Sequence, residues 1–168
     1  MSELKKVAVI MGSDSDFPVV KKAGEVLKEF GVPFEMRVLS AHRSPREVAE
    51  FASTARENGF GVVIAAAGMA AHLAGAVAGN TTLPVIAIPV KAKALEGMDA
   101  LLSSVMMPPG VPVATVGIDG AANAGYLAVE ILAVTDDGLA EKLAAFKKKQ
   151  NEKNLEADRK MQEEAAKL

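Results

Sequence analysis

Five continuous apolar runs alternate along this chain with segments whose apolar residues recur at helical spacing. The runs cover residues 7–11, 34–39, 61–67, 83–90 and 111–117. Such runs, bounded by turn residues, are typical of strands buried on both faces. Between them, apolar stripes over 19–30 and 48–55 predict helices, and Gly31 ends the first of these. The pattern therefore favours a parallel sheet covered by helices on both sides.

A sheet of this kind places its strand-to-helix loops along one edge, because the crossovers between parallel strands are right-handed. Ligands bind beyond the carboxyl ends of such strands, at a topological switch point. The loops at 12–16, 40–45 and 65–75 are therefore the candidates for a binding site. We expect residues 1–168 to form a single domain, since no repeat or linker divides them.

Composition excludes several classes of function. The absence of cysteine rules out disulfides and cysteine-ligated zinc. A net charge of −2 gives no general attraction to nucleic acid, and one Tyr with no Trp argues against a base-stacking platform. No apolar run approaches the length of a membrane helix, and the N-terminal MSELKK lacks a signal-peptide core. We therefore expect a cytoplasmic protein that binds a small ligand, not a membrane or a nucleic acid.

The C-terminal segment 136–168 differs from the rest in its charge. Leu139, Leu143 and Phe146 continue a helical face, and the residues after them are charged but helix-favouring. We expect a helix that packs on this subunit or on a neighbouring one and then frays. The alternative for the last dozen residues is a solvated tail.

The loop at 12–16 reads Gly-Ser-Asp-Ser-Asp and lies between a strand and a helix. Its hydroxyls, Ser13 and Ser15, and the free amides at the helix start suit a phosphate. Asp16 would repel a phosphate, so it either caps the helix or accepts hydrogen bonds from ribose hydroxyls. A helix start with no ligand needs only one such cap, and the loop alone does not decide between these readings.

The loop at 40–45 contains the strongest candidate for chemistry. Arg43 presents a planar set of donors that suits phosphate or carboxylate, while Ser44 and Pro45 are typical of a helix start. His42 is one of two histidines in the chain. Imidazole exchanges protons near neutral pH, so His42 beside Arg43 at a strand end indicates an acid/base residue.

The segment 65–75 is rich in Ala and Gly, and small side chains let the backbone approach a ligand. His72 either points into the site or is a satisfied interior residue, and the residues alone slightly favour the second. The segment 95–110, rich in Met, Gly and Pro, is either an adaptable lid or a subunit contact. Asn123 is expected to cap the last helix before 136.

Other chemistries lack their motifs. The two histidines are 30 residues apart without an HExxH spacing, so no metal site is expected. No GxSxG or Walker motif occurs, and the third strand ends in AAAG where a response regulator needs an acidic residue. Flavin binding stays open because of the hydroxyl-rich first loop, although aromatic residues that could flank a flavin are scarce.

Taken together, five motifs in one order resemble the PurE family of purine-biosynthesis enzymes. They are MGSDSD at 11–16, SAHRSP at 40–45, GMAAHLAG at 68–75, MPPGVPVATVGI at 107–118 and GAANAG at 120–125. SAHR with AAHL is similar to the class I mutases, whereas class II carboxylases typically have SAHK. The resemblance implies a flavodoxin-like three-layer α/β/α sandwich with a C-terminal helical extension. It also implies a homo-octamer in which that helix helps the subunits to associate, and no metal or organic cofactor.

The resemblance also implies roles for individual residues. His42 matches the essential acid/base of a mutase that moves a carboxylate from the exocyclic nitrogen of a ribonucleotide to ring carbon four. The expected substrate-binding residues are Ser13, Asp16 and Arg43 at the ribose phosphate, with Ser15, Ser40, Gly68, Met69 and His72 lining the same pocket.

The sequence departs from the family pattern at four positions: Ala66, Met69 and Ala74 replace Gly, Gly and Pro, and Met106 replaces Gln. Met69 adds bulk beside the expected carbon dioxide pocket. Two alternatives to the mutase stay open, which are a direct carboxylase that uses carbon dioxide and a non-catalytic nucleotide-binding paralogue.

Overall fold

The computed structural model describes residues 4–168, whose centre is one sheet of five parallel strands. The strands are β1 (Lys6–Met11), β2 (Phe34–Val38), β3 (Phe60–Gly68), β4 (Val85–Val90) and β5 (Ala114–Thr115), in the order β2-β1-β3-β4-β5. This order is that of flavodoxin-like folds, and it places a switch point between β1 and β3. The predicted three-layer α/β/α class is confirmed, while the order itself could not be predicted from the sequence.

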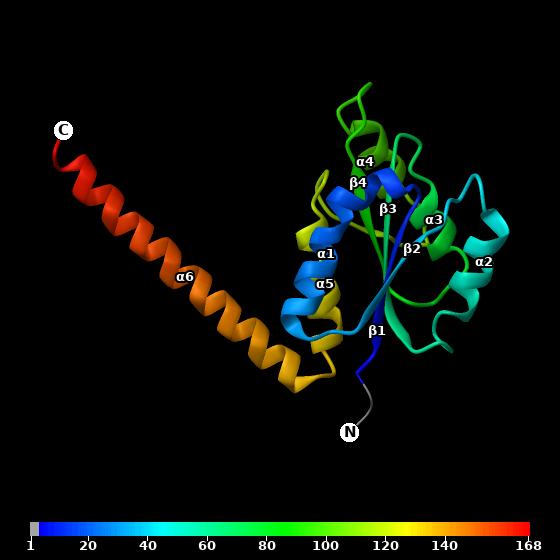
Figure 1. Cartoon of the computed structure of the whole chain (residues 1–168), viewed down its shortest axis with the longest axis horizontal. Coiled ribbons are helices and arrows are strands. Elements are labelled where there is room, and N and C mark those ends of the chain that lie inside the picture. The colour runs from blue at the N-terminus through cyan, green and yellow to red at the C-terminus, as the bar shows by residue number, and fades with distance from the viewer. Residues whose placement is uncertain (1–3) are drawn as a thin grey trace.

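Successive side chains of each strand enter different layers. The helices are α1 (Phe17–Phe30), α2 (Pro45–Thr54), α3 (Leu73–Ala78), α4 (Met98–Val105), α5 (Ala121–Ala133) and α6 (Asp137–Ala165), with a short 3₁₀ turn η1 (Asp14–Asp16) before α1. Val7 and Val9 pack against α1 and α5, and Ala8 and Ile10 pack against α2 and α3. Figure 1 shows these two helical layers on opposite sides of the sheet. Burial on both faces explains why the strand sequences are continuously apolar.

The layer formed by α1 and α5 depends on one close approach. A Cβ added at Gly125 of α5 would lie 2.9 Å from the Ala23 carbonyl oxygen of α1. Glycine therefore permits the two helices to touch along their backbones. The end of α1 is set by Gly31, whose φ of 74° is left-handed and whose N–H donates to the Leu27 and Lys28 carbonyls, as predicted.

The fifth strand is shorter than the predicted 111–117. Only Ala114 and Thr115 pair with β4, and the Val116 N–H donates to the Ala87 carbonyl at 3.1 Å. Pro89 follows two residues later in β4, and its carbonyl accepts from Asp119 on the same side. Proline has no N–H, so Pro89 cannot donate the next hydrogen bond of the ladder between β4 and β5. The apolar run therefore predicted the position of the strand but overestimated its length.

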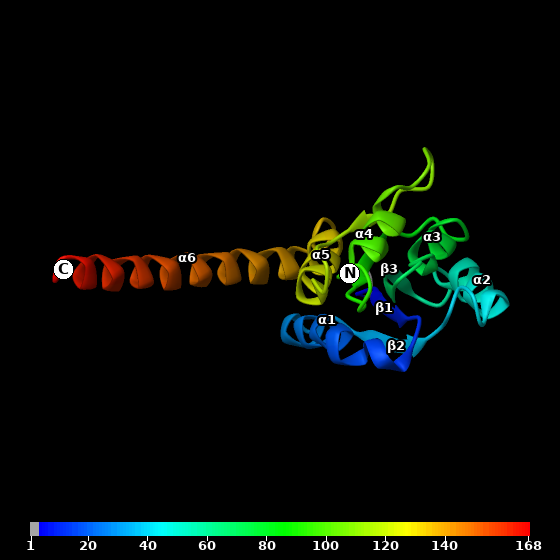
Figure 2. The same ribbon diagram turned by 90° about the horizontal axis from the view of Figure 1, so that it is seen from above.

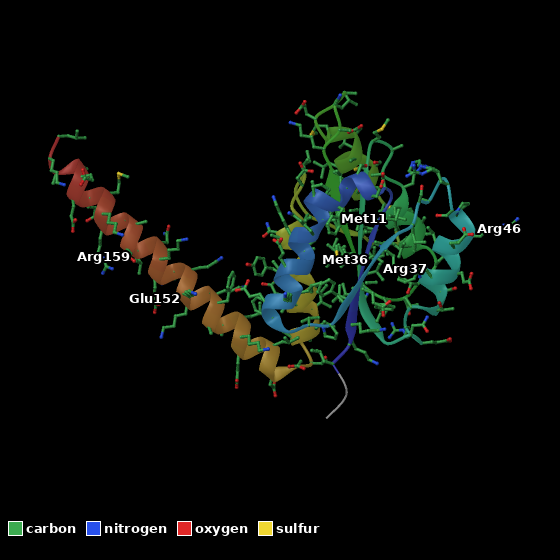
Figure 3. All side chains as sticks on the ribbon, in the orientation of Figure 1. Met11, Met36, Arg37, Arg46, Glu152 and Arg159 are labelled. Carbon is green, nitrogen blue, oxygen red and sulfur yellow. The ribbon has the colours of Figure 1, made fainter. Side chains whose placement is uncertain are left out.

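Helix α6 begins on the body of the protein and then leaves it. The Asp136 carboxylate caps it by accepting from the Leu139 N–H at 2.9 Å, and Leu139 and Leu143 are buried. Phe146 stacks on Tyr126 with ring centroids 4.8 Å apart. Beyond it the helix projects into solvent, as Figures 1 and 2 show and as the outward side chains around Glu152 and Arg159 in Figure 3 illustrate.

The predicted helix in the segment 136–168 is therefore present, and its first part packs on its own subunit. The expected fraying is wrong, because the helix continues to Ala165. Packing on a neighbouring subunit stays a prediction. Within residues 4–168 no helix combines the length and the apolar character needed to cross a membrane.

Candidate active site

A pocket of about 650 Å³ lies beyond the carboxyl ends of β1, β2, β3 and β4. It straddles the switch point, where flavodoxin-like sheets bind ligands. All nine predicted site residues line it: Ser13, Ser15, Asp16, Ser40, His42, Arg43, Gly68, Met69 and His72. In Figure 3, Met11 marks the end of β1 from which the first of these loops leaves. The three candidate loops thus contribute to one cavity, and the roles of their residues stay predictions.

Hydrogen bonds within the first loop hold its hydroxyls together. The Ser13 hydroxyl accepts from the Ser15 N–H at 3.3 Å and from the Ser15 hydroxyl at 2.8 Å, and so caps η1. Asp16 occupies the N-cap position of α1 but makes no capping bond with its side chain. The capping explanation for Asp16 is therefore wrong, and its carboxylate lines the pocket instead.

The environment of Asp16 disfavours the ionised carboxylate relative to that of an exposed aspartate. Burial raises the pKa of this carboxyl above its ordinary value, and Asp14 adds a smaller effect in the same direction. A hydrogen bond with the Ser13 backbone and the charge of Arg43 oppose the rise in pKa but do not cancel it. A partly buried acceptor of this kind is suited to ribose hydroxyls, which are donors that compensate for the lost water.

The second loop fixes Arg43 against the first. The guanidinium donates from Nη2 to the Gly12 carbonyl at 2.5 Å and from Nε to the Ser40 hydroxyl at 3.4 Å. Ser44 stands at the N-cap of α2, yet its hydroxyl bonds to Ser40 instead of capping, with the Ser40 N–H donating to it at 3.0 Å. These bonds join the loops after β1 and β2, so the Arg43 cation is positioned before any ligand arrives.

His42 and His72 meet across the pocket wall. The Nε2 atom of His42 lies 2.7 Å from the Nδ1 atom of His72, with the ring planes at 73°. Both side chains are exposed and both line the pocket. The interior reading of His72, which the residues slightly favoured, is therefore wrong. His72 stands at the N-cap position of α3, without a capping bond from its side chain.

The third loop combines close packing with local strain. A Cβ on Gly68 would lie 3.1 Å from the Val90 carbonyl oxygen of β4, so glycine suits this approach. Met69 follows with a φ of 55°, in the left-handed region, and its side chain is 66% exposed on the pocket wall. The Ala71 N–H donates to the Ser103 hydroxyl at 3.0 Å, which connects this loop to α4.

Lys91 is a pocket residue that the sequence reasoning missed. It follows β4 directly, its N–H donates to the Asp119 carboxylate at 2.9 Å, and its ammonium pairs with Glu96. The hydrogen bond and the charge of Glu96 raise the Lys91 pKa, so the side chain is a cation. The rule that ligands bind beyond the ends of parallel strands could have found it, had it been applied to the fourth strand as well.

A family model described as AIR carboxylase matches residues 6–153. The chain belongs to this family. The N5-carboxyaminoimidazole ribonucleotide mutase of Bacillus subtilis is 57% identical over 139 residues, which cover 82% of this chain and 86% of that protein. The protein of the same name from Pyrococcus abyssi is 56% identical over 144 residues, covering 86% of this chain and 83% of that protein.

Among solved structures, the crystal structure of Treponema denticola PurE is similar at 30% sequence identity with a TM-score of 0.84. The match covers 92% of this chain and 96% of that chain. The resemblance to PurE, based on the five motifs, is therefore confirmed.

The remaining motifs of this AIR carboxylase family member, at 107–118 and 120–125, lie outside the pocket lining. Met107 packs against Gly75, where an added Cβ would lie 3.2 Å from its sulfur. In the segment 95–110, Leu102 of α4 and Met106 at its C-cap are exposed, so both the lid and the subunit contact stay predictions. The capping role expected for Asn123 is wrong, because Gly120 is the N-cap of α5.

Within residues 4–168 no three potential ligands among His, Asp and Glu converge on a point that could hold a metal ion.

Proposed function

We propose that this chain is an N5-carboxyaminoimidazole ribonucleotide mutase that acts in purine biosynthesis. The observation that carries the proposal is that His42 and Arg43 share one cavity with the Ser13 and Asp16 loop. Two relatives that are 56% and 57% identical over most of this chain bear that name. The proposed reaction moves a carboxylate from the exocyclic nitrogen of the substrate to carbon four of its imidazole ring.

The ribose phosphate binds at the end of β1 and β2. Arg43 supplies a cation that its bonds to Gly12 and Ser40 already orient, and the Ser13 hydroxyl supplies a donor beside it. Asp16 accepts hydrogen bonds from the ribose hydroxyls. The base then lies near β3, and the presence of Gly68 and His72 in the pocket lining supports this orientation.

Proton transfer by His42 drives the two halves of the reaction. Protonated His42 gives its proton to the carbamate nitrogen, and the N–C bond breaks. This step releases carbon dioxide and forms the aminoimidazole. Carbon four of the ring then attacks carbon dioxide and forms the new C–C bond. Neutral His42 finally removes the proton from carbon four, which restores its starting state. A positioned acid or base of this kind contributes about 10²–10⁴-fold to a rate.

Containment of carbon dioxide in the pocket is the second contribution to the rate of the reaction. Holding both fragments in one pocket replaces a bimolecular encounter, which is worth about 7–11 kcal/mol for well-oriented groups. Gly68 and the small residues next to it allow close approach of the ring, and Met69 lines the pocket beside them.

Replacing His42 by asparagine tests the proposal. The His42→Asn variant should bind the nucleotide as before but lose turnover by about 10²–10⁴-fold, because only the proton carrier is removed. Arg43→Ala is the matched variant for binding, and it should chiefly raise KM. Unchanged turnover in His42→Asn would remove the acid/base role, and unchanged affinity in Arg43→Ala would remove this side chain from the phosphate site.

A direct aminoimidazole ribonucleotide carboxylase is the second candidate, because the matching family model is itself described as AIR carboxylase. Supplying the enzyme with either bicarbonate and the uncarboxylated nucleotide or the N-carboxylated nucleotide distinguishes the two. The mutase consumes only the second efficiently. A protein that binds both nucleotides and converts neither would be the non-catalytic paralogue, for which the bulk of Met69 is the feature to examine.

The proposed enzyme is a cytoplasmic homo-octamer that needs no metal or organic cofactor. Exposed apolar side chains on α4 and at its C-cap, among them Leu102 and Met106, and the projecting part of α6 support association between subunits. Light scattering on the full chain measures the assembly, and a monomer at micromolar concentration would contradict it. Turnover that survives exhaustive dialysis against a chelator tests the independence from metal.

A further inference from the structure

The two histidines of this protein form a pair that their spacing in the sequence does not predict. They lie 30 residues apart, after different strands, yet Nε2 of His42 and Nδ1 of His72 are 2.7 Å apart. This distance is that of a strong hydrogen bond between ring nitrogens. The chain has two histidines in all, so every imidazole it possesses takes part in this contact.

The chemistry of imidazole restricts how the pair can carry protons. A neutral ring has one N–H donor and one acceptor nitrogen, whereas a protonated ring has two donors. A hydrogen bond between the facing nitrogens needs one proton, not two. Both rings therefore cannot be protonated while the contact persists, and one of the facing nitrogens must be an acceptor.

The pocket that the pair lines also contains two cationic side chains and one carboxyl group. Arg43 follows His42 on the second loop, and Lys91 lines the pocket from the end of β4. Both are cations, so they oppose a second positive charge on the pair. Asp16, from the first loop, is the acidic group of the pocket lining, and burial raises its pKa.

We propose that His72 is a positioning residue that accepts a hydrogen bond from His42 Nε2 and so fixes the tautomer of the proposed acid/base. This inference rests on the role given to His42 above. With Nε2–H donated to His72, the neutral ring of His42 keeps its free lone pair on Nδ1. The proton that His42 delivers to the carbamate nitrogen therefore leaves from Nδ1, and the proton taken from ring carbon four returns to Nδ1.

Throughout this cycle His72 stays neutral, with its own proton on Nε2 and its Nδ1 as acceptor. No proton is stored on it, and the N–H···N bond is kept in both protonation states of His42. The opposite arrangement, with His72 Nδ1–H donating to His42, would place the proton of neutral His42 on Nδ1 and block it as a base. The position of one hydrogen atom thus decides whether the second histidine supports the reaction.

Nuclear magnetic resonance of ¹⁵N-histidine-labelled protein tests this directly, because only two residues give signals. In the free enzyme at neutral pH, we expect Nδ1 of His72 to have the shift of an acceptor nitrogen and a coupling to the protonated Nε2 of His42. The His42→Asn variant provides the reference for unpaired His72. A proton on His72 Nδ1, or His72 shifts identical in wild type and reference, would overturn the proposal.

Kinetics provides a second measurement with matched variants. His72→Asn keeps an oxygen that can accept from His42, whereas the similarly sized His72→Leu removes the acceptor. We expect His72→Leu to lower kcat by roughly 10–100-fold with little change in KM, and His72→Asn to retain most of kcat. A change in KM alone, or equal losses in both variants with the wild-type circular dichroism, would show that His72 only lines the pocket.

The acid/base role of His42 and the control of its tautomer by His72 can be refuted independently of each other. If His42→Asn leaves turnover unchanged while the ¹⁵N signals show the pair, the acid/base role of His42 is wrong and the structural pairing stands. If His42→Asn abolishes turnover and the pair is not detected, the mutase mechanism stands and the tautomer control by His72 is wrong.

Discussion

Replacing Gly125 by alanine tests how closely α1 and α5 depend on each other. The added Cβ would lie 2.9 Å from the Ala23 carbonyl oxygen and 2.9 Å from the Val26 Cβ, whereas ordinary contacts begin at 3.4 Å. Both neighbours belong to the buried layer, so the helices must separate. Overpacking of this kind costs about 1–3 kcal/mol, and the better helix propensity of alanine returns about 1 kcal/mol.

The net loss expected for Gly125→Ala is therefore about 0–2 kcal/mol, which corresponds to a decrease in Tm of up to roughly 8 °C for a chain of this size. Urea unfolding and thermal melting, at one protein concentration, measure it. Gly75→Ala is the matched control, because its Cβ would meet the flexible end of Met107 at 3.2 Å and receives the same gain in helix propensity. If the two variants are equally stable, the close approach of α1 and α5 does not carry the energy assigned to it.

Two further variants test local strain and charge in the pocket. Because burial raises the pKa of Asp16 above 3.8, the folded state binds its proton more tightly than the unfolded state, and the ionised carboxylate costs stability at neutral pH. Asp16→Asn should therefore raise Tm at pH 7, and the gain should vanish as the pH falls below 3.8; a gain independent of pH would contradict this cause. Met69→Gly should stabilise the fold by about 1 kcal/mol, because glycine accepts a φ of 55° without strain and the methionine is largely exposed. Met106→Ala is the control, because this methionine is 77% exposed but has an unstrained φ of −84°. This variant should not raise Tm.

The strands and the first helix could be predicted because their signals are local. The apolar runs of β1 and β3 reflect burial on both faces, and Gly31 ends α1 through its own backbone conformation. The length of β5 could not be predicted, since it depends on Pro89 in a neighbouring strand. The strand order has no local signal either, because it results from how the two layers of helices pack.

The candidate site shows the same division. Arg43 and His42 could be predicted because polar residues directly after an apolar strand lie at the ligand edge of a parallel sheet. The contact between the His42 and His72 rings could not be predicted from the residues, because a separation of 30 residues does not determine how close two loops lie. The position of Asp16 before α1 predicts a capping role, yet Ser13 caps the preceding turn and the Asp16 side chain makes no capping bond.

The projecting part of α6 offers a point of attachment that leaves the pocket untouched. From Lys147 to Ala165 the helix is exposed and extends for about 28 Å at 1.5 Å per residue. Because the chain contains no cysteine, a cysteine introduced at Met161 would be its sole thiol. A fluorophore or cross-linker placed there would report on encounters between molecules from a site outside the pocket lining.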